Sequence, residues 1–61
     1  MALASKITML RKRNSWSQEE LAEKMDVSRQ SVSKWESGAS VPDLSRVLQL
    51  SELFQEPRIF F

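Results

Sequence analysis

Residues 29–37 carry the side chains whose types and spacing have the clearest chemistry. At 100° per residue of helix, five polar side chains fall within about 140° of one another. They are Arg29, Ser33, Ser37, Gln30 and Lys34. This face holds no carboxylate, and Val32 and Trp35 lie on the opposite side. An arginine can donate two hydrogen bonds to guanine, and a glutamine can pair with adenine. On an isolated helix, however, the same pattern is an ordinary solvated face.

The composition argues against catalysis and against a bound cofactor. The 61 residues contain no histidine and no cysteine, so the commonest general base and the thiolate metal ligands are missing. The single glycine excludes a glycine-rich phosphate loop. We therefore predict a domain that is not an enzyme and binds a partner, with no metal, cofactor or small-molecule ligand.

Length and charge allow one domain with an uneven surface. A chain of 61 residues has room for a single core. Residues 1–13 carry four cations and no acid, residues 14–27 are net acidic, and residues 28–37 are mildly basic. This distribution matters more than the net charge of +1, but it does not separate a nucleic-acid surface from ordinary solvated charge. No apolar run approaches the roughly 20 residues of a membrane span, so we predict no membrane contact.

Helical periodicity and capping residues predict four helices and no strand. The expected helices, and the apolar tail after them, are residues 3–13, 18–25, 29–37, 44–55 and 56–61. Ser17, Ser28 and Asp43 are expected to cap the last three helices. Glu20 would complete a capping box with Ser17. Gly38 falls at a helix end that requires a left-handed backbone.

Only residues 26–28 separate the second and third expected helices. So short a joint forces a sharp turn between them, which is the helix-turn-helix arrangement. The flanking runs are WSQEELAEKM at 16–25 and VSRQSVSKWESG at 27–38, with VPDL at 41–44 and LSELF at 50–54. These runs resemble the phage-repressor-like helix-turn-helix family of the Cro and XRE type. The resemblance covers about residues 3–54.

The resemblance implies an all-α, compact lambda-repressor-like domain of four to five helices. Two features depart from the family pattern. The family often has glycine where Asp26 stands, although aspartate tolerates a left-handed backbone better than most residues. The family also usually continues into a fifth helix after Phe54, and residues 55–61 are too short for one. The family's oligomer geometry is therefore not carried over.

In this context the polar face of residues 29–37 is predicted to enter the major groove of duplex DNA. Arg29 and Gln30 stand at its N-terminal end and are the predicted base readers, with Ser33 and Lys34 reaching further bases or phosphates one turn later. Gln18 matches the family's backbone-contacting glutamine. Contacts with DNA phosphates are predicted for Ser17, Gln18, Ser28, Ser37 and Ser40.

Two further residue pairs are assigned to structure rather than to DNA. Arg11 borders the apolar stripe of the first helix, and Glu36 borders Val32 on the third. In the family the matching positions often hold a partly buried ion pair, and we predict that pair here. Trp16 and Trp35 fall at apolar positions, so they are predicted core residues and not stacking platforms for bases.

The predicted function is sequence-specific binding of double-stranded DNA by a transcription regulator that represses by occupying its operator. Apolar residues cover about 220° of the helix at 44–55, more than a small domain needs. They predict a homodimer formed through this helix and the tail at 56–61. A tail that folds back on the monomer is the alternative. An antitoxin-like or other protein-interaction module is the competing function. The expected location is the cytoplasm of a bacterium, for a bacterial or phage-encoded protein.

Overall fold

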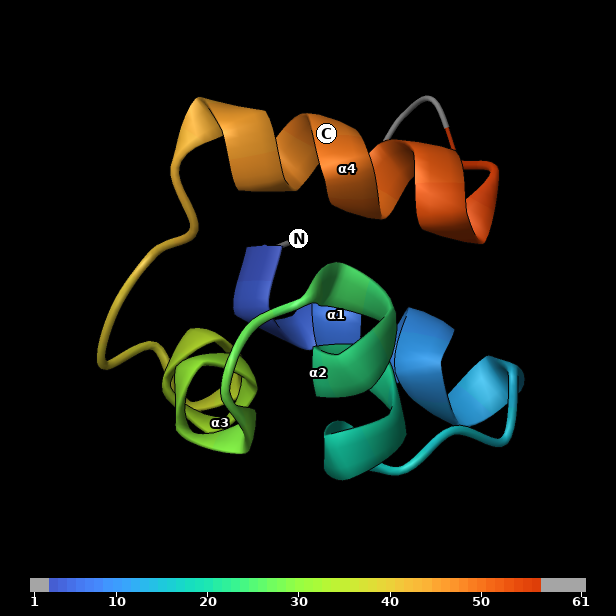
Figure 1. Ribbon diagram of the computed structural model, residues 1–61, viewed down its shortest axis with the longest axis horizontal. Helices are drawn as coiled ribbons and strands as arrows, with labels where there is room; N and C mark the ends of the chain where they lie inside the picture. The colour runs from blue at the N-terminus through green and yellow to red at the C-terminus, as the bar shows by residue number, and fades with distance from the viewer. Residues whose placement is uncertain (1–2, 57–61) are drawn as a thin grey trace.

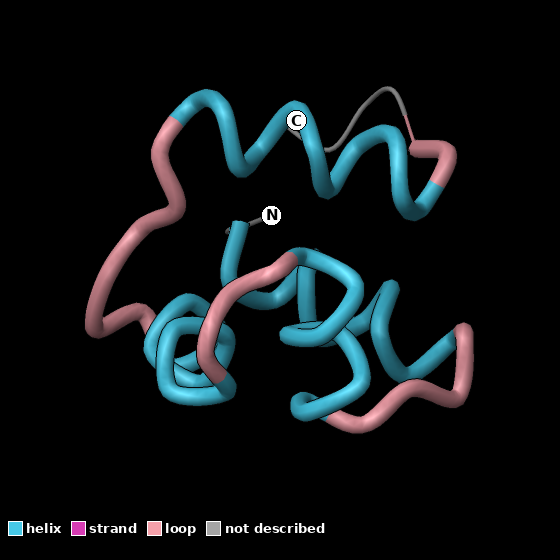
Figure 2. The backbone as a smooth tube through the Cα atoms, viewed as in Figure 1, coloured by secondary structure: helices cyan, strands magenta, loops and turns pink. Residues whose placement is uncertain are grey.

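The computed structural model describes residues 3–56, which form four helices and no strand (Figures 1 and 2). The helices are α1 (Leu3–Arg13), α2 (Gln18–Met25), α3 (Arg29–Ser37) and α4 (Leu44–Phe54). Figure 1 shows α1, α2 and α3 gathered together, with α4 running along one side of them. The described part of the chain contains no helix long and apolar enough to cross a membrane.

The helix bounds match the expected ones except at one end. α4 stops at Phe54, one residue before the predicted end, because Gln55 adopts a left-handed backbone with φ 53°. Of the apolar tail expected at 56–61, only Glu56 lies within the described residues. The all-α fold predicted from the sequence is confirmed.

Side chains just before α2, α3 and α4 fix where each helix begins. Ser17, Ser28 and Asp43 each accept a hydrogen bond from the backbone amide three residues further on, at 3.0, 3.1 and 2.9 Å respectively. The Glu20 carboxylate in turn accepts from the Ser17 amide at 2.9 Å. All three predicted caps and the capping box are confirmed, and they satisfy amides that a helix start leaves without partners.

Three helix ends use a left-handed residue other than glycine. These residues are Ser15, Asp26 and Gln55, with φ of 61°, 57° and 53°. At each end this residue's amide donates to the carbonyl three residues back, and the next amide donates to the carbonyl five residues back. That pattern is the Schellman motif, in which glycine is usual because other L-residues lose about 1–2 kcal/mol in this conformation. Only α3 ends on glycine, Gly38 with φ 83°, as predicted.

All four helices contribute to one apolar core. Its buried members are Ile7, Leu10, Leu21, Ala22, Met25, Val32, Trp35, Val47, Leu50 and Phe54. Trp16 packs against this core from the loop after α1, and its ring stacks on Phe54 with centroids 5.5 Å apart. Both tryptophans therefore serve the core, as the sequence predicts. The core holds α3 with one face inward, which determines which side chains meet the solvent.

Candidate nucleic-acid interface

The outward face of α3 is polar along its whole length. Val32 is fully buried and Trp35 is 7% exposed, so the opposite side of the helix is turned to solvent. Five residues on this side are predicted DNA contacts. Ser33 is half-buried, and the other four are exposed: Arg29, Gln30, Lys34 and Ser37. Because Glu36 points inward to Arg11, this face presents two cations and no carboxylate. Such a surface suits a polyanionic ligand.

The first residues of α2 and α3 meet through their side chains. Arg29 Nη1 donates to Gln18 Oε1 at 3.4 Å. The turn at residues 26–28 makes this contact possible, because the left-handed Asp26 ends α2 and Ser28 starts α3 almost at once. The structure thus brings together one predicted base reader and one predicted phosphate contact. The sequence did not predict that they touch each other.

Gln18 also connects to the predicted ion pair. Its Nε2 donates to Glu36 Oε1 at 3.2 Å. Arg11 Nε donates to Glu36 Oε2 at 2.6 Å, and Arg11 Nη2 donates to Oε1 at 3.0 Å. The third guanidinium nitrogen donates to the Trp16 carbonyl at 2.9 Å. A continuous chain of hydrogen bonds therefore runs from the edge of the core to Arg29 on the exposed face.

The ion pair is well shielded from solvent. The side chains of Arg11 and Glu36 are 12% and 7% exposed. Burial is the largest influence on Glu36 and acts to raise its pKa. Hydrogen bonds from Arg11 and Gln18, and the charge of Arg11, together outweigh it and hold the pKa of Glu36 below its ordinary value. The pKa of Arg11 is raised, chiefly by its hydrogen bond to Glu36. The Glu36 charge is therefore compensated within the protein.

The predicted phosphate contacts fall at two separate places. Ser17 and Ser28 accept the cap bonds with their oxygens, which leaves the Ser17 hydroxyl hydrogen available to donate. Ser28 Oγ also lies 3.1 Å from Ser31 Oγ, in a hydrogen bond that either hydroxyl can donate. Ser37 Oγ donates to the Lys34 carbonyl at 3.2 Å, and Ser40 is exposed in the loop after α3. These last two lie at the other end of α3, about 12 Å from its start at 1.5 Å per residue. Ser17, Gln18 and Ser28 are beside the helix starts where Arg29 also lies.

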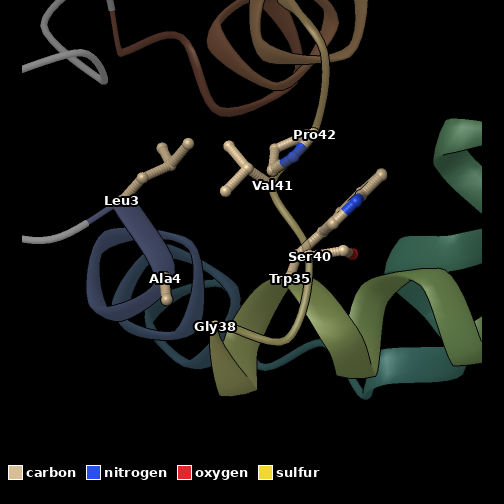
Figure 3. A pocket seen from close by; sticks show the side chains of 7 residues that line it. All are labelled: Leu3, Ala4, Trp35, Gly38, Ser40, Val41 and Pro42. Atoms are coloured by element: carbon tan, nitrogen blue, oxygen red, sulfur yellow. The ribbon is translucent and has the colours of Figure 1, made fainter.

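A small apolar hollow lies beyond the far end of α3 (Figure 3). Its volume is about 210 Å³, and it lies between the start of α1, the end of α3 and the loop before α4. Leu3, Trp35 and Val41 are among the side chains that line it, and no ionisable side chain does. It is smaller than the usual 300–1,000 Å³ of a small-molecule site. The polar face of α3 is therefore the stronger candidate site.

A contact between α4 and the end of α2 was not predicted from the sequence. Arg46 Nη1 donates to the Met25 carbonyl at 3.1 Å, and Gln49 Nε2 donates to the same oxygen at 3.3 Å. Arg46 Nη1 also donates to Gln49 Oε1 at 2.9 Å. The only signal in the sequence was the i, i+3 spacing of Arg46 and Gln49, which places them side by side on α4.

Comparisons with known proteins agree on one family. The sequence profile of the helix-turn-helix family matches residues 7–61. Over 54 residues the chain is 39% identical to the HTH-type transcriptional activator BcrR of Enterococcus faecalis. The matched segment covers 88% of this chain and 26% of that relative. The chain thus spans about a quarter of the length of the curated relative it matches. No solved structure matches the chain.

Proposed function

This chain belongs to the helix-turn-helix family of the Cro and C1 (XRE) type, and from that premise we propose that it reads duplex DNA sequence-specifically. The observation that carries the proposal is the outward face of α3, which presents two cations and no carboxylate over a buried apolar face. In this arrangement α3 lies in the major groove. Arg29 and Gln30 contact base edges at its N-terminal end, and Ser33 and Lys34 contact bases or phosphates one turn later.

Phosphate contacts complete the proposed interface. Gln18 uses its carbonyl oxygen for Arg29 and one amide hydrogen for Glu36, so its second amide hydrogen remains for a phosphate oxygen. It stands at the start of α2, where free backbone amides favour an anion. Ser17 offers its hydroxyl hydrogen beside it, and Ser28 does so when Ser31 is the donor in the bond between their hydroxyls. Ser37 and Ser40 are proposed to contact the phosphates at the other end of α3.

Selection of bound duplexes from a randomised DNA library tests sequence-specific reading. We would select at about 0.15 M salt, where nonspecific phosphate binding is weakened. Enrichment of a common motif supports the proposal, and an inverted repeat also supports a dimer. A domain that is folded by circular dichroism and enriches no motif would contradict the proposal.

We further propose that the protein regulates transcription, and that it represses by occupying its operator. The relative named above is described as an activator, so the direction of regulation needs its own test. A reporter gene with the enriched motif placed over the promoter should be silenced when the protein is expressed. The same motif placed upstream of the promoter should have no effect. Increased expression from the upstream motif would replace repression with activation.

A homodimer through α4 and the tail at 56–61 is the proposed assembly. Leu44 and Leu48 of α4 are 65% and 49% exposed, and Val41 in the preceding loop is 76% exposed. A second copy that covers these side chains would remove the apolar surface from water. Light scattering with a duplex at saturation should give the mass of two chains per duplex. A single chain on the saturated duplex would contradict the dimer.

A further inference from the structure

The carbonyl end of α2 is held by side chains from α4, far away in the sequence. The Met25 side chain is fully buried, and its backbone carbonyl accepts from both Arg46 and Gln49. The two donors also bond to each other, so Arg46 Nη1 lies 2.9 Å from Gln49 Oε1. We call these three residues the α2–α4 contact. It places a cation at the negative end of the α2 dipole, where positive charge is favourable.

The α2–α4 contact lies next to the turn that directs α3. Met25 is the last residue of α2, and the left-handed Asp26 follows it directly. The amides of Asp26 and Val27 turn back to the carbonyls of Glu23 and Ala22, so those two carbonyls are satisfied within the turn. The Met25 carbonyl instead takes its donors from α4. The end of α2 beside the turn is therefore joined both to the core and to α4.

Resting on the proposed function, we propose that Arg46, with Gln49, is a positioning residue for DNA reading. By holding the Met25 carbonyl it fixes the turn at residues 26–28, and the turn fixes the direction in which α3 leaves. Direct contacts with base edges carry the sequence information and need side chains placed to within about 0.5 Å, whereas phosphate contacts carry none directly. Loss of the α2–α4 contact should therefore weaken binding to the preferred sequence more than binding to other sequences.

The test compares the parent with Arg46→Met and Arg46→Lys on the duplex that the parent enriches and on a scrambled duplex. Arg46→Met keeps the aliphatic stem and removes the donors, whereas Arg46→Lys retains a charged donor. All titrations are done at a temperature where circular dichroism shows each variant fully folded. We expect Arg46→Met to bind the enriched duplex about tenfold more weakly, comparable to one mismatched base pair. Binding to the scrambled duplex should change little, and Arg46→Lys should recover part of the loss.

Salt dependence separates positioning from a direct phosphate contact. The affinity falls with salt concentration, and removal of a phosphate contact makes the slope of log K against log salt concentration less steep by about 0.9. It also weakens binding to all sequences alike. We expect Arg46→Met to leave that slope unchanged. A reduced slope with equal losses on both duplexes would overturn the positioning role. The exposed Ser45→Ala on the same helix is the control that should leave every value unchanged.

Hydrogen exchange gives a readout that does not depend on DNA. We expect the Asp26 and Val27 amides to exchange faster in Arg46→Met than in the parent, with the amides of α1 unchanged.

If Arg46→Met does not fold, Gln49→Leu removes the second donor and is judged by the same criteria. Failure of both variants to fold would show a purely structural role and overturn the proposal. A folded parent that enriches no sequence overturns the proposed function, and this proposal with it. Equal sequence preference in the parent and Arg46→Met overturns the positioning role alone.

Discussion

The two ends of α2 are attached to the rest of the protein by different chemistry. At the N-terminal end, Gln18 connects to Glu36 and Arg29, and Glu36 is ion-paired with Arg11. At the C-terminal end, Arg46 and Gln49 hold a neutral backbone carbonyl. The first attachment contains a carboxylate that can be protonated, and the second contains no acid. The same helix should therefore lose one attachment at low pH and keep the other.

The largest effect is expected from breaking the ion pair at the N-terminal end. Glu36→Gln leaves the shielded Arg11 charge without its counter-ion, and removal of one partner of a buried pair costs about 3–5 kcal/mol. Urea or thermal unfolding at pH 7 measures the loss of stability. The matched control is Glu23→Gln, because Glu23 is exposed on the same fold. A Glu36→Gln variant that melts within a degree of the parent would contradict a structural role for the pair.

The pH dependence of unfolding should identify the same carboxylate. Because the pKa of Glu36 is lower in the folded protein than in the unfolded chain, its contribution is fully present above the unfolded value of about 4.3. That contribution is lost as the pH falls through the folded value. The difference in unfolding free energy between the parent and Glu36→Gln should accordingly shrink below about pH 4. A constant difference from pH 7 down to pH 2 would show that the Glu36 charge is not what stabilises the fold.

Breaking the C-terminal attachment should cost less and should not depend on pH. Arg46→Met removes a charge-assisted hydrogen bond at a half-buried position, which we expect to cost about 1–2 kcal/mol. Because this attachment contains no acid, the loss should be the same at pH 4 and pH 7. Urea unfolding at both values makes the measurement. A loss that disappears at the lower pH would place an acid in this attachment and remove the contrast between the two ends of α2.

The smallest effect is expected from the turn residue itself. Asp26 puts a negative charge at the negative end of the α2 dipole, and Asn adopts the left-handed backbone more readily than most residues. Asp26→Asn should therefore stabilise the fold by about 0.5 kcal/mol. Asp26→Ala, which removes the charge but disfavours the left-handed backbone, is the informative comparison and should destabilise it. Equal stability of the two variants would mean that the backbone conformation at this position contributes little.

Local features of this fold could be predicted from the sequence, and contacts between distant segments only in part. Ser17, Ser28 and Asp43 cap helices through bonds to amides three residues away, so their role follows from short-range spacing. The turn at Asp26 followed from the short joint between two periodic segments. The left-handed Gln55 was missed because glutamine has no preference for that conformation.

The candidate site shows the same division. The polar face of α3 follows from helical periodicity, and the Arg11–Glu36 pair was indicated by a resemblance together with two positions at the borders of apolar stripes. The bonds from Gln18 to Arg29 and from Arg46 to Met25 depend on how whole helices are placed. Gln18 and Arg29 are 11 positions apart in the sequence, and Met25 and Arg46 are 21 positions apart. No helical periodicity relates residues at these separations. Side chains that orient α3 were therefore less visible in the sequence than those on its surface.

The most direct test of the central claim is parallel selection of duplexes by the parent and by Arg29→Ala at about 0.15 M salt. The parent should enrich a motif. Arg29→Ala should enrich the same motif with the preference relaxed at one base position, at a cost of about 1–3 kcal/mol for the parent motif. An unchanged motif, with equal losses of affinity on all sequences, would show that Arg29 contacts only the phosphate backbone and would contradict base reading by the start of α3.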